Sequence, residues 1–320
     1  MMRKLISIFL LFQLFSPASF AQSKDELLKL QDSLKVLGNK MPTLKPEFAR
    51  YECNEKFNKM LGGLLESQGS FELTWDSVRY MSVITPADEA FRLYTWAVRK
   101  DNGDYEYFGY LQLNPKADEG EKLYELNDKS DYISSPEMKL LAPDNWLGAV
   151  YYKVIQTKYK GHKSYTLLGW KGNSLLTTKK VIEVISFKSS GSPVFGAALF
   201  RKYKEKEKPV RVVFEYSAKA SMSLKYEKQF MHVFKKKKNK KKKDVLKREN
   251  MIVFDRLGPL DARVSEYSTD LEGQYQFYVP ETNIIDAFVF RSGRWVYVKD
   301  IDARNPPPPK KKKALPPPKL

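Results

Sequence analysis

Cysteine is nearly missing from this sequence, since Cys53 is the only one in 320 residues. A single cysteine cannot close an intramolecular disulfide, which excludes the disulfide-stabilised class of exported domains. Cys53 stands at helical spacing from Phe57 and Met60, which places it on an apolar stripe. We therefore expect a buried structural thiol, because reactive thiols need exposure and a nearby positive group.

Histidine is almost as scarce, with only His162 and His232. His162 lies in a "YKGHKSY" turn, where an exposed side chain is expected, and His232 alternates with Phe230 and Phe234 along a strand-like run. A packing role for His232 is favoured over a catalytic base. Neither histidine has metal-ligand spacing to Cys53, so no metal and no cofactor is predicted.

Familiar catalytic motifs are missing as well. The sequence contains no G-x-S-x-G elbow, no H-E-x-x-H helix, no phosphate-binding G-x-x-x-x-G-K-[ST] loop and no dinucleotide fingerprint. These absences disfavour serine hydrolases, zinc proteases and nucleotide-dependent enzymes. Whether the chain is an enzyme stays open, and a binding protein is favoured.

Long hydrophobic runs are absent too, and the longest apolar run, Leu5 to Phe15, is short for a membrane span. It follows Arg3 and Lys4, and small residues end the segment at Ala21. This pattern predicts a signal peptide over residues 1–21, cleaved after Ala21. We expect a protein that is periplasmic, outer-membrane-associated or extracellular, with no transmembrane span after cleavage.

Positive charge is abundant but unevenly distributed. The formal net charge is +18, and most of it comes from one lysine tract at 235–243 and from the C-terminal lysines at 310–313 and 319. The remaining chain is nearly balanced, which indicates polycationic segments on an ordinary globular body.

The lysine tract lies between the strand-like runs "QFMHVF" and "NMIVFDRL", so we expect a lysine-rich loop over 235–249. No aromatic residue or arginine interrupts the lysines, which excludes sequence-specific nucleic-acid recognition. Charge alone makes an anionic envelope lipid or polysaccharide the candidate partner, and a merely solvated loop is the alternative. The predicted anionic-surface-binding residues are Lys235, Lys236, Lys237, Lys238, Lys240, Lys241, Lys242 and Lys243.

The predicted fold is mainly β within the α+β class. Residues 22–68 carry two amphipathic helices, one over 24–37 and one from near Pro46 until Gly62 and Gly63 weaken or end it. About a dozen short aromatic and β-branched runs follow over 69–302, with hairpin signals at Asn102-Gly103 and Ser292-Gly293. They predict an antiparallel meander forming a curled sheet, barrel or sandwich.

Two parts of this organisation are less regular. The apolar positions of Thr177 to Ile185 fit either a strand or a short helix. The segment 303–320 is rich in proline and lysine, and it is predicted to be a disordered, extended tail.

Two further residue sets are candidates for chemistry. Acidic residues gather in a polar connection, where a carboxylate pair would suit a hydrolase and an ordinary surface loop is the favoured alternative. They are Asp255, Asp261, Glu266, Asp270 and Glu272. Aromatic residues alternate through the first and last strand groups and could stack on a ligand, although core packing is favoured. They are Tyr80, Tyr94, Trp96, Tyr105, Tyr107, Phe108 and Tyr110, then Tyr275, Phe277, Tyr278, Trp295 and Tyr297.

Three stretches resemble conserved secreted proteins of the Bacteroidota that have no assigned activity. They begin with "DSVRYMSVITPADEAF", "SYTLLGWKGNSLLTTKK" and "NMIVFDRLGPLDARVSEY", and the likeness extends over roughly residues 70 to 300. The resemblance implies an envelope location and supplies no activity. The sequence thus predicts an envelope-associated binding or structural protein tethered by its polybasic segments, with a carboxylate-dependent hydrolase as the alternative.

Overall fold

The structure is a computed structural model. It describes residues 24–116, 123–203, 208–237, 240–261, 263 and 271–301, with the backbone alone over 232–246 and 271–272. The predicted signal peptide and the predicted tail 303–320 lie outside the described residues.

Two helices precede the strands along the chain, as predicted, and short helical elements lie between later strands. The helical elements are α1 Lys24–Lys40, η1 Met41–Thr43, α2 Glu47–Leu65, η2 Ser70–Glu72, η3 Ser130–Tyr132, η4 Pro136–Met138, η5 Pro143–Asn145 and α4 Leu271–Tyr275. The first strands are β1 Ser82–Ile84, β2 Phe91–Arg99, β3 Tyr105–Leu113, β4 Leu123–Asn127, β5 Val150–Tyr159, β6 His162–Lys171 and β7 Thr177–Phe187. The others are β8 Pro193–Phe195, β9 Phe200–Arg201, β10 Val212–Ser217, β11 Leu224–Lys237, β12 Lys240–Pro259, β13 Tyr278–Arg291 and β14 Arg294–Val298.

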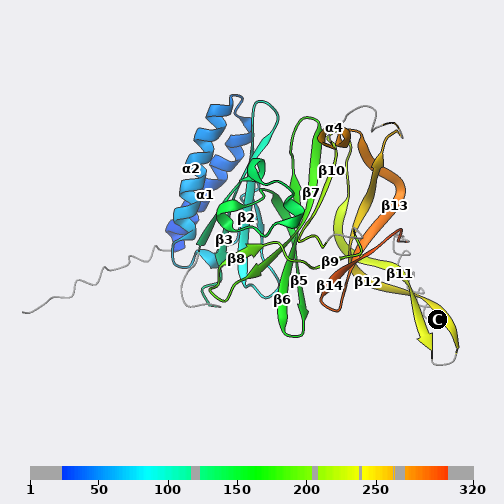
Figure 1. The fold of residues 1–320 in the computed structure, drawn as a ribbon. Coiled ribbons are helices and arrows are strands. Elements are labelled where there is room, and N and C mark those ends of the chain that lie inside the picture. Colours follow the sequence, from blue (N-terminus) through cyan, green and yellow to red (C-terminus); the bar gives the residue numbers. More distant parts are fainter. Residues whose placement is uncertain are drawn as a thin grey trace, which may run out of the picture.

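Three sheets stack behind the pair of N-terminal helices (Figure 1). The first sheet has the order β1-β2-β3-β4, the middle sheet β10-β7-β6-β5 with β8 also on β7, and the third β11-β12-β13-β14-β9. Every pairing between these strands is antiparallel except that of β14 with β9. The predicted α+β class is confirmed, and the architecture is a layered sandwich of open sheets.

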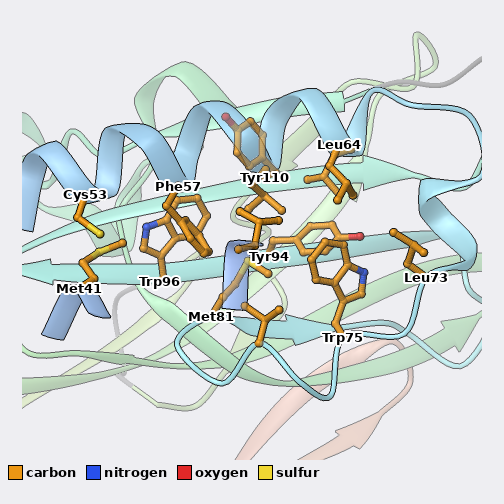
Figure 2. Packing of buried hydrophobic residues seen from close by; sticks show 14 of the residues in the cluster. Met41, Cys53, Phe57, Leu64, Leu73, Trp75, Met81, Tyr94, Trp96 and Tyr110 are labelled. Carbon is orange, nitrogen blue, oxygen red and sulfur yellow. The ribbon is translucent and has the colours of Figure 1, made fainter. Parts of the chain in front are cut away.

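The helix layer packs on the outer face of the first sheet (Figure 2). Phe57 of α2 lies edge-on to Trp96 of β2, with ring centroids 5.2 Å apart. The indole N–H of Trp96 donates to the side-chain oxygen of Asn54 at 2.7 Å, so these two buried polar groups are paired. Cys53 is 6% exposed in the same cluster, which confirms the predicted buried thiol.

The helix α2 continues through the two glycines that were expected to weaken or end it, and it stops at Leu65. A Cβ atom at Gly62 would lie 3.0 Å from the hydroxyl oxygen of Tyr110. Glycine at this position therefore allows close approach of the helix to β3, because packing against the sheet offsets its poor helix propensity.

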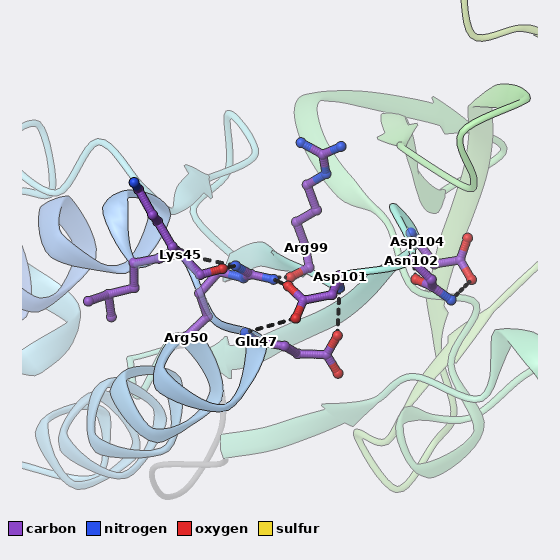
Figure 3. Close-up of polar contacts among 8 residues, drawn as sticks. Lys45, Glu47, Arg50, Arg99, Asp101, Asn102 and Asp104 are labelled. Atoms are coloured by element: carbon purple, nitrogen blue, oxygen red, sulfur yellow. Dashed lines mark hydrogen bonds and ion pairs between the residues drawn. The ribbon is translucent and has the colours of Figure 1, made fainter.

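A polar contact fastens the start of α2 to the turn between β2 and β3 (Figure 3). Arg50 donates to a carboxylate oxygen of Asp101 at 2.5 Å and to the carbonyl oxygen of Arg99 at 2.8 Å. The Asp101 N–H donates in turn to the Glu47 carboxylate at 2.6 Å. Gly103, at φ 91°, supplies the left-handed residue of the predicted hairpin turn.

The middle sheet is buried on both faces. Val181, Ile182, Val184 and Ile185 of β7 have no exposed surface. Ile185 packs in the cluster facing the first sheet, and Ile182 and Val184 pack in the cluster facing the third. Apolar residues on both faces of this part of β7 remove the period of two from its sequence. This explains the ambiguity over Thr177 to Ile185, which the structure resolves as strand.

Candidate functional site

The lysine tract lies at the end of a long two-stranded ribbon. β11 extends to Lys237 and β12 begins at Lys240, with Lys235 paired to Lys243 and Lys237 to Lys240. The predicted loop over 235–249 is therefore wrong for the described residues, which are strand. The hydrogen-bonded pairing of β11 with β12 continues from the preceding strand residues into the lysine tract. It continues because backbone N–H and C=O groups in the tract gain hydrogen-bond partners from the opposite strand.

Among the described strands, none pairs with the outer part of this ribbon as a third strand. β12 pairs with β13 only from Ile252 onward, so residues 240–251 have β11 as their only strand partner within the described chain. Figure 1 shows the ribbon projecting away from the three sheets. Lysines at directly opposed positions repel each other, so the paired tip gains stability when negative charge lies beside it.

The base of the ribbon is held to the third sheet by ionic contacts. Glu249 of β12 pairs with Lys247 and with Arg291 of β13. Partial burial alone would raise the pKa of Glu249, but the hydrogen bonds from Lys247 and Arg291 hold it below its ordinary value. Arg248 lies 5.5 Å above the ring of Phe230. These side-chain contacts next to the third sheet hold the base of the ribbon in its orientation.

The structure does not gather the five predicted carboxylates into one described site. Asp255, in β12, accepts the Ser223 N–H at 2.7 Å and lines a cavity. Asp261 pairs with Arg263 at 2.9 Å on the surface. Glu266, Asp270 and the side chain of Glu272 lie outside the described residues.

Asp255 instead lines a cavity together with acidic residues that sequence reasoning did not select. The cavity has a volume of about 300 Å³ and lies between β10 of the middle sheet and β12 and β13 of the third, next to α4. It is lined by Glu137, Tyr203, Val213, Phe214, Glu215, Phe254, Asp255, Arg256, Leu257, Tyr275, Tyr278, Asp286 and Tyr297. Sequence offered no signal for this grouping, because its members come from six separate elements and from the segment that follows β9.

One of these carboxylates is held ionised. Arg256 donates to both oxygens of Asp286, from Nε at 3.0 Å to Oδ2, and Tyr297 donates to Oδ2 at 2.6 Å. Burial alone would raise the pKa of Asp286, but these hydrogen bonds and that from the Asp300 amide hold it below its ordinary value. A general acid must begin the reaction protonated, so Asp286 does not suit that role.

Most of the predicted aromatic residues fill cores. Tyr94, Trp96, Tyr107 and Trp295 are at most 1% exposed. Tyr275, Tyr278 and Tyr297 of the last group line the acidic cavity instead, and Tyr80 and Tyr105 of the first group line other cavities, so the ligand-facing alternative fits these residues. His162 is exposed at the start of β6, as expected, and the His232 side chain lies outside the described residues.

A second cavity, of about 280 Å³, contains a buried lysine that sequence reasoning missed. Lys171, at the end of β6, donates to the Ser130 hydroxyl at 2.7 Å and to the Gly148 carbonyl at 3.0 Å. Its ammonium lies 4.1 Å above the ring of Tyr107. Burial lowers the pKa of Lys171 to about 8, although the Asp128 charge acts against this shift. The available signal was alternation, since Lys171 follows Leu167 and Gly169 on one face of the strand.

Comparisons of the chain with known protein families, with curated proteins and with solved structures found no match. Within the described part of the chain, no helix has the length and apolar character needed to cross a membrane. The same residues contain no cluster of three or more histidine, cysteine or acidic side chains able to hold a metal ion. Function must therefore be argued from the ribbon and the cavities themselves.

Proposed function

We propose that this chain is an exported, envelope-associated binding protein whose lysine-rich ribbon attaches it to an anionic surface, lipid or polysaccharide. The single observation that carries the proposal is the ribbon, a paired extension that leaves the sheets and ends in the lysine tract. A β-ribbon concentrates the lysines more than a flexible loop of the same length, which strengthens attraction to a charged surface.

The distribution of charge supports the same proposal. The eight lysines of the tract occur within nine consecutive residues, whereas most of the chain has interspersed charges of both signs. Attraction of this kind is screened by salt and has no sequence or stereochemical specificity. The ribbon would therefore determine where the protein resides, while specific recognition would belong to another site.

The test compares two variants of the full chain that lose the same charge. In the ribbon variant the eight tract lysines become serine. In the control variant eight exposed lysines spread over the body become serine. The control positions are Lys29, Lys35, Lys59, Lys129, Lys158, Lys160, Lys188 and Lys219.

Binding is measured by co-sedimentation with phosphatidylcholine vesicles with and without phosphatidylglycerol, and with an acidic polysaccharide, at rising salt. Because a lysine near an anionic membrane contributes about 1 kcal/mol, the ribbon variant should bind such a surface at least about 100-fold more weakly than the control variant. Binding that depends on phosphatidylglycerol identifies lipid as the source of the negative charge. Equal and salt-insensitive binding of both variants to every surface would overturn the proposal.

A further inference from the structure

We propose that the cavity between β10, β12 and β13 binds an organic ammonium group, held between two carboxylates and a set of tyrosine rings. The carboxylates are those of Glu137, in η4, and Asp255, in β12. The rings are those of Tyr203, Tyr275, Tyr278 and Tyr297. This inference is independent of the lysine ribbon.

Two of the four carboxylates in the cavity are already neutralised. Asp286 is paired with Arg256. Glu215 lies 3.2 Å from the Lys179 ammonium and also accepts the Thr177 hydroxyl at 2.7 Å. The partly exposed cations Arg256 and Lys179 balance these two carboxylates, which leaves little of their negative charge for a ligand.

The other two carboxylates have no cationic partner among the described residues. Asp255 receives one backbone hydrogen bond, from Ser223, and Glu137 receives none at its side chain. Arg256, the cation that lines this cavity, is bound to Asp286. A partly buried negative charge without a counter-charge is unfavourable, so this cavity carries an electrostatic preference for a positive ligand.

Glu137 lies close to the aromatic wall. Burial raises the pKa of Tyr203 and of Tyr275, and the negative charge of Glu137 contributes to the rise at both hydroxyls. One carboxylate therefore influences two tyrosines that line the same cavity. Its position is set by Arg211, which donates to the carbonyl oxygens of Pro136 and Lys139 on either side of it.

The tyrosine rings meet at steep angles. Tyr203 and Tyr297 have ring centroids 5.5 Å apart and an interplanar angle of 73°, and Tyr275 and Tyr278 have 5.5 Å and 72°. The rings therefore line the cavity at different angles. Ring faces attract cations, most strongly those that shed water easily, and quaternary ammonium groups are bound in this manner.

Other ligand classes fit less well. A hard metal ion needs about six oxygen ligands, and the described residues contain no suitable acidic cluster. A neutral sugar would stack on the rings and donate hydroxyl hydrogen bonds to the carboxylates, but it would bring no positive charge to balance the negative charges of Glu137 and Asp255. An organic ammonium satisfies the carboxylates and the rings together.

The experiment uses the full chain with choline as the probe and its neutral isostere 3,3-dimethylbutan-1-ol as the matched ligand. Calorimetric titration should show choline binding at least about tenfold tighter than the isostere, because only the charged probe gains the carboxylate and ring attraction. Pentylamine and pentan-1-ol repeat this comparison for a primary ammonium, and tighter binding of either cation supports the proposal.

The variants Glu137→Gln and Asp255→Asn keep the shape of each side chain and remove its charge. Each should weaken binding of the cationic probe about tenfold, whereas Glu52→Gln, on the exposed face of α2, should leave it unchanged. Melting temperatures close to that of the wild type show that the variants fold. Isosteres that bind as tightly as both cations, or cation binding that survives in both cavity variants, would overturn the proposal.

Discussion

Arg211 and Glu183 form an ion pair that is wholly removed from solvent. The Nε atom of Arg211 lies 2.6 Å from Oε2 of Glu183, and neither side chain has any exposed surface. The same guanidinium donates to the carbonyl oxygens of Pro136, Lys139 and Phe195. One buried cation thus joins β7, β8 and the η4 segment that carries a wall of the acidic cavity.

Replacing one partner of this pair should be strongly destabilising. Arg211→Met would leave Glu183 as an unpaired buried carboxylate, and we expect the free energy of unfolding to fall by about 3–5 kcal/mol, measured by urea denaturation. The double variant Arg211→Met/Glu183→Leu removes both charges and should recover a large part of the loss. If Arg211→Met had nearly the same urea midpoint as the wild type, the ion pair would not be buried in solution.

Lys171 should make stability depend on pH in the alkaline range. Its pKa is about 8 in the folded chain against an ordinary value of 10.5, so the unfolded chain binds more protons between these pH values. The free energy of unfolding should therefore rise with pH across this window, by about 3 kcal/mol from this group. Below pH 8 the penalty for burying the ammonium is fully present.

The measurement is urea denaturation of the wild type and of Lys171→Met at several pH values from 7 to 10.5. Other titrating groups cancel in the difference between the two proteins, so the wild type should gain about 3 kcal/mol relative to the variant as pH rises. Lys59→Met, at an exposed position of α2, serves as the control and should show a constant difference. If the difference in free energy of unfolding between the wild type and Lys171→Met were also independent of pH, the lowered pKa of Lys171 would be wrong.

Cys53 should react slowly with thiol reagents. Burial raises the pKa of its thiol, and the thiol donates to the Leu37 carbonyl oxygen at 3.6 Å between α1 and α2. We expect the folded chain to react with a disulfide reagent at least about 100-fold more slowly than the urea-unfolded chain at the same pH. Equal rates would mean that the two helices separate readily from each other.

Arg50 should stabilise the contact between the helices and the first sheet far more than an exposed ion pair does. Its side chain is 11% exposed, and it binds Asp101 and the carbonyl oxygens of Leu44, Lys45 and Arg99. Arg50→Ala should lower the free energy of unfolding by about 2 kcal/mol, because three carbonyl groups lose their donor.

The matched control for Arg50 lies on the same helix. Lys56 and Glu52 form a pair four residues apart in which both side chains are 63% exposed. Lys56→Ala should leave the urea midpoint unchanged, because water screens such pairs. A similar midpoint for both variants would show that the contact drawn in Figure 3 adds no stability.

Much of the local structure could be predicted from the residues. The hairpin at Ser292-Gly293 forms as expected, with φ values of 46° and 79° at these two positions. The buried Cys53 follows from its place on the apolar stripe. The predicted lysine loop was wrong because strand pairing propagated into it from both sides, a result that charge patterning alone does not reveal.

Charged residues inside apolar runs were the missed signals. Glu183 interrupts "KVIEVISF" and Arg211 lies in "VRVVFEY", and each run belongs to the middle sheet or its border. A charge in a strand buried on both faces requires a partner. The sequence indicates that such a partner exists, but the choice of partner depends on how distant segments align.

The sequence by itself determined the helices before strands, the hairpin turns, the antiparallel class and the concentration of positive charge in short segments. These features depend on local propensity, alternation and composition, which are properties of residues that are neighbours in the sequence. Only the tertiary structure decided that Glu137 and Asp255 line one cavity, that the Lys171 ammonium lies over the Tyr107 ring, and that the lysines end a paired ribbon. Alternation assigns a side chain to one of two faces, whereas the stacking and register of three sheets select what lies opposite that face.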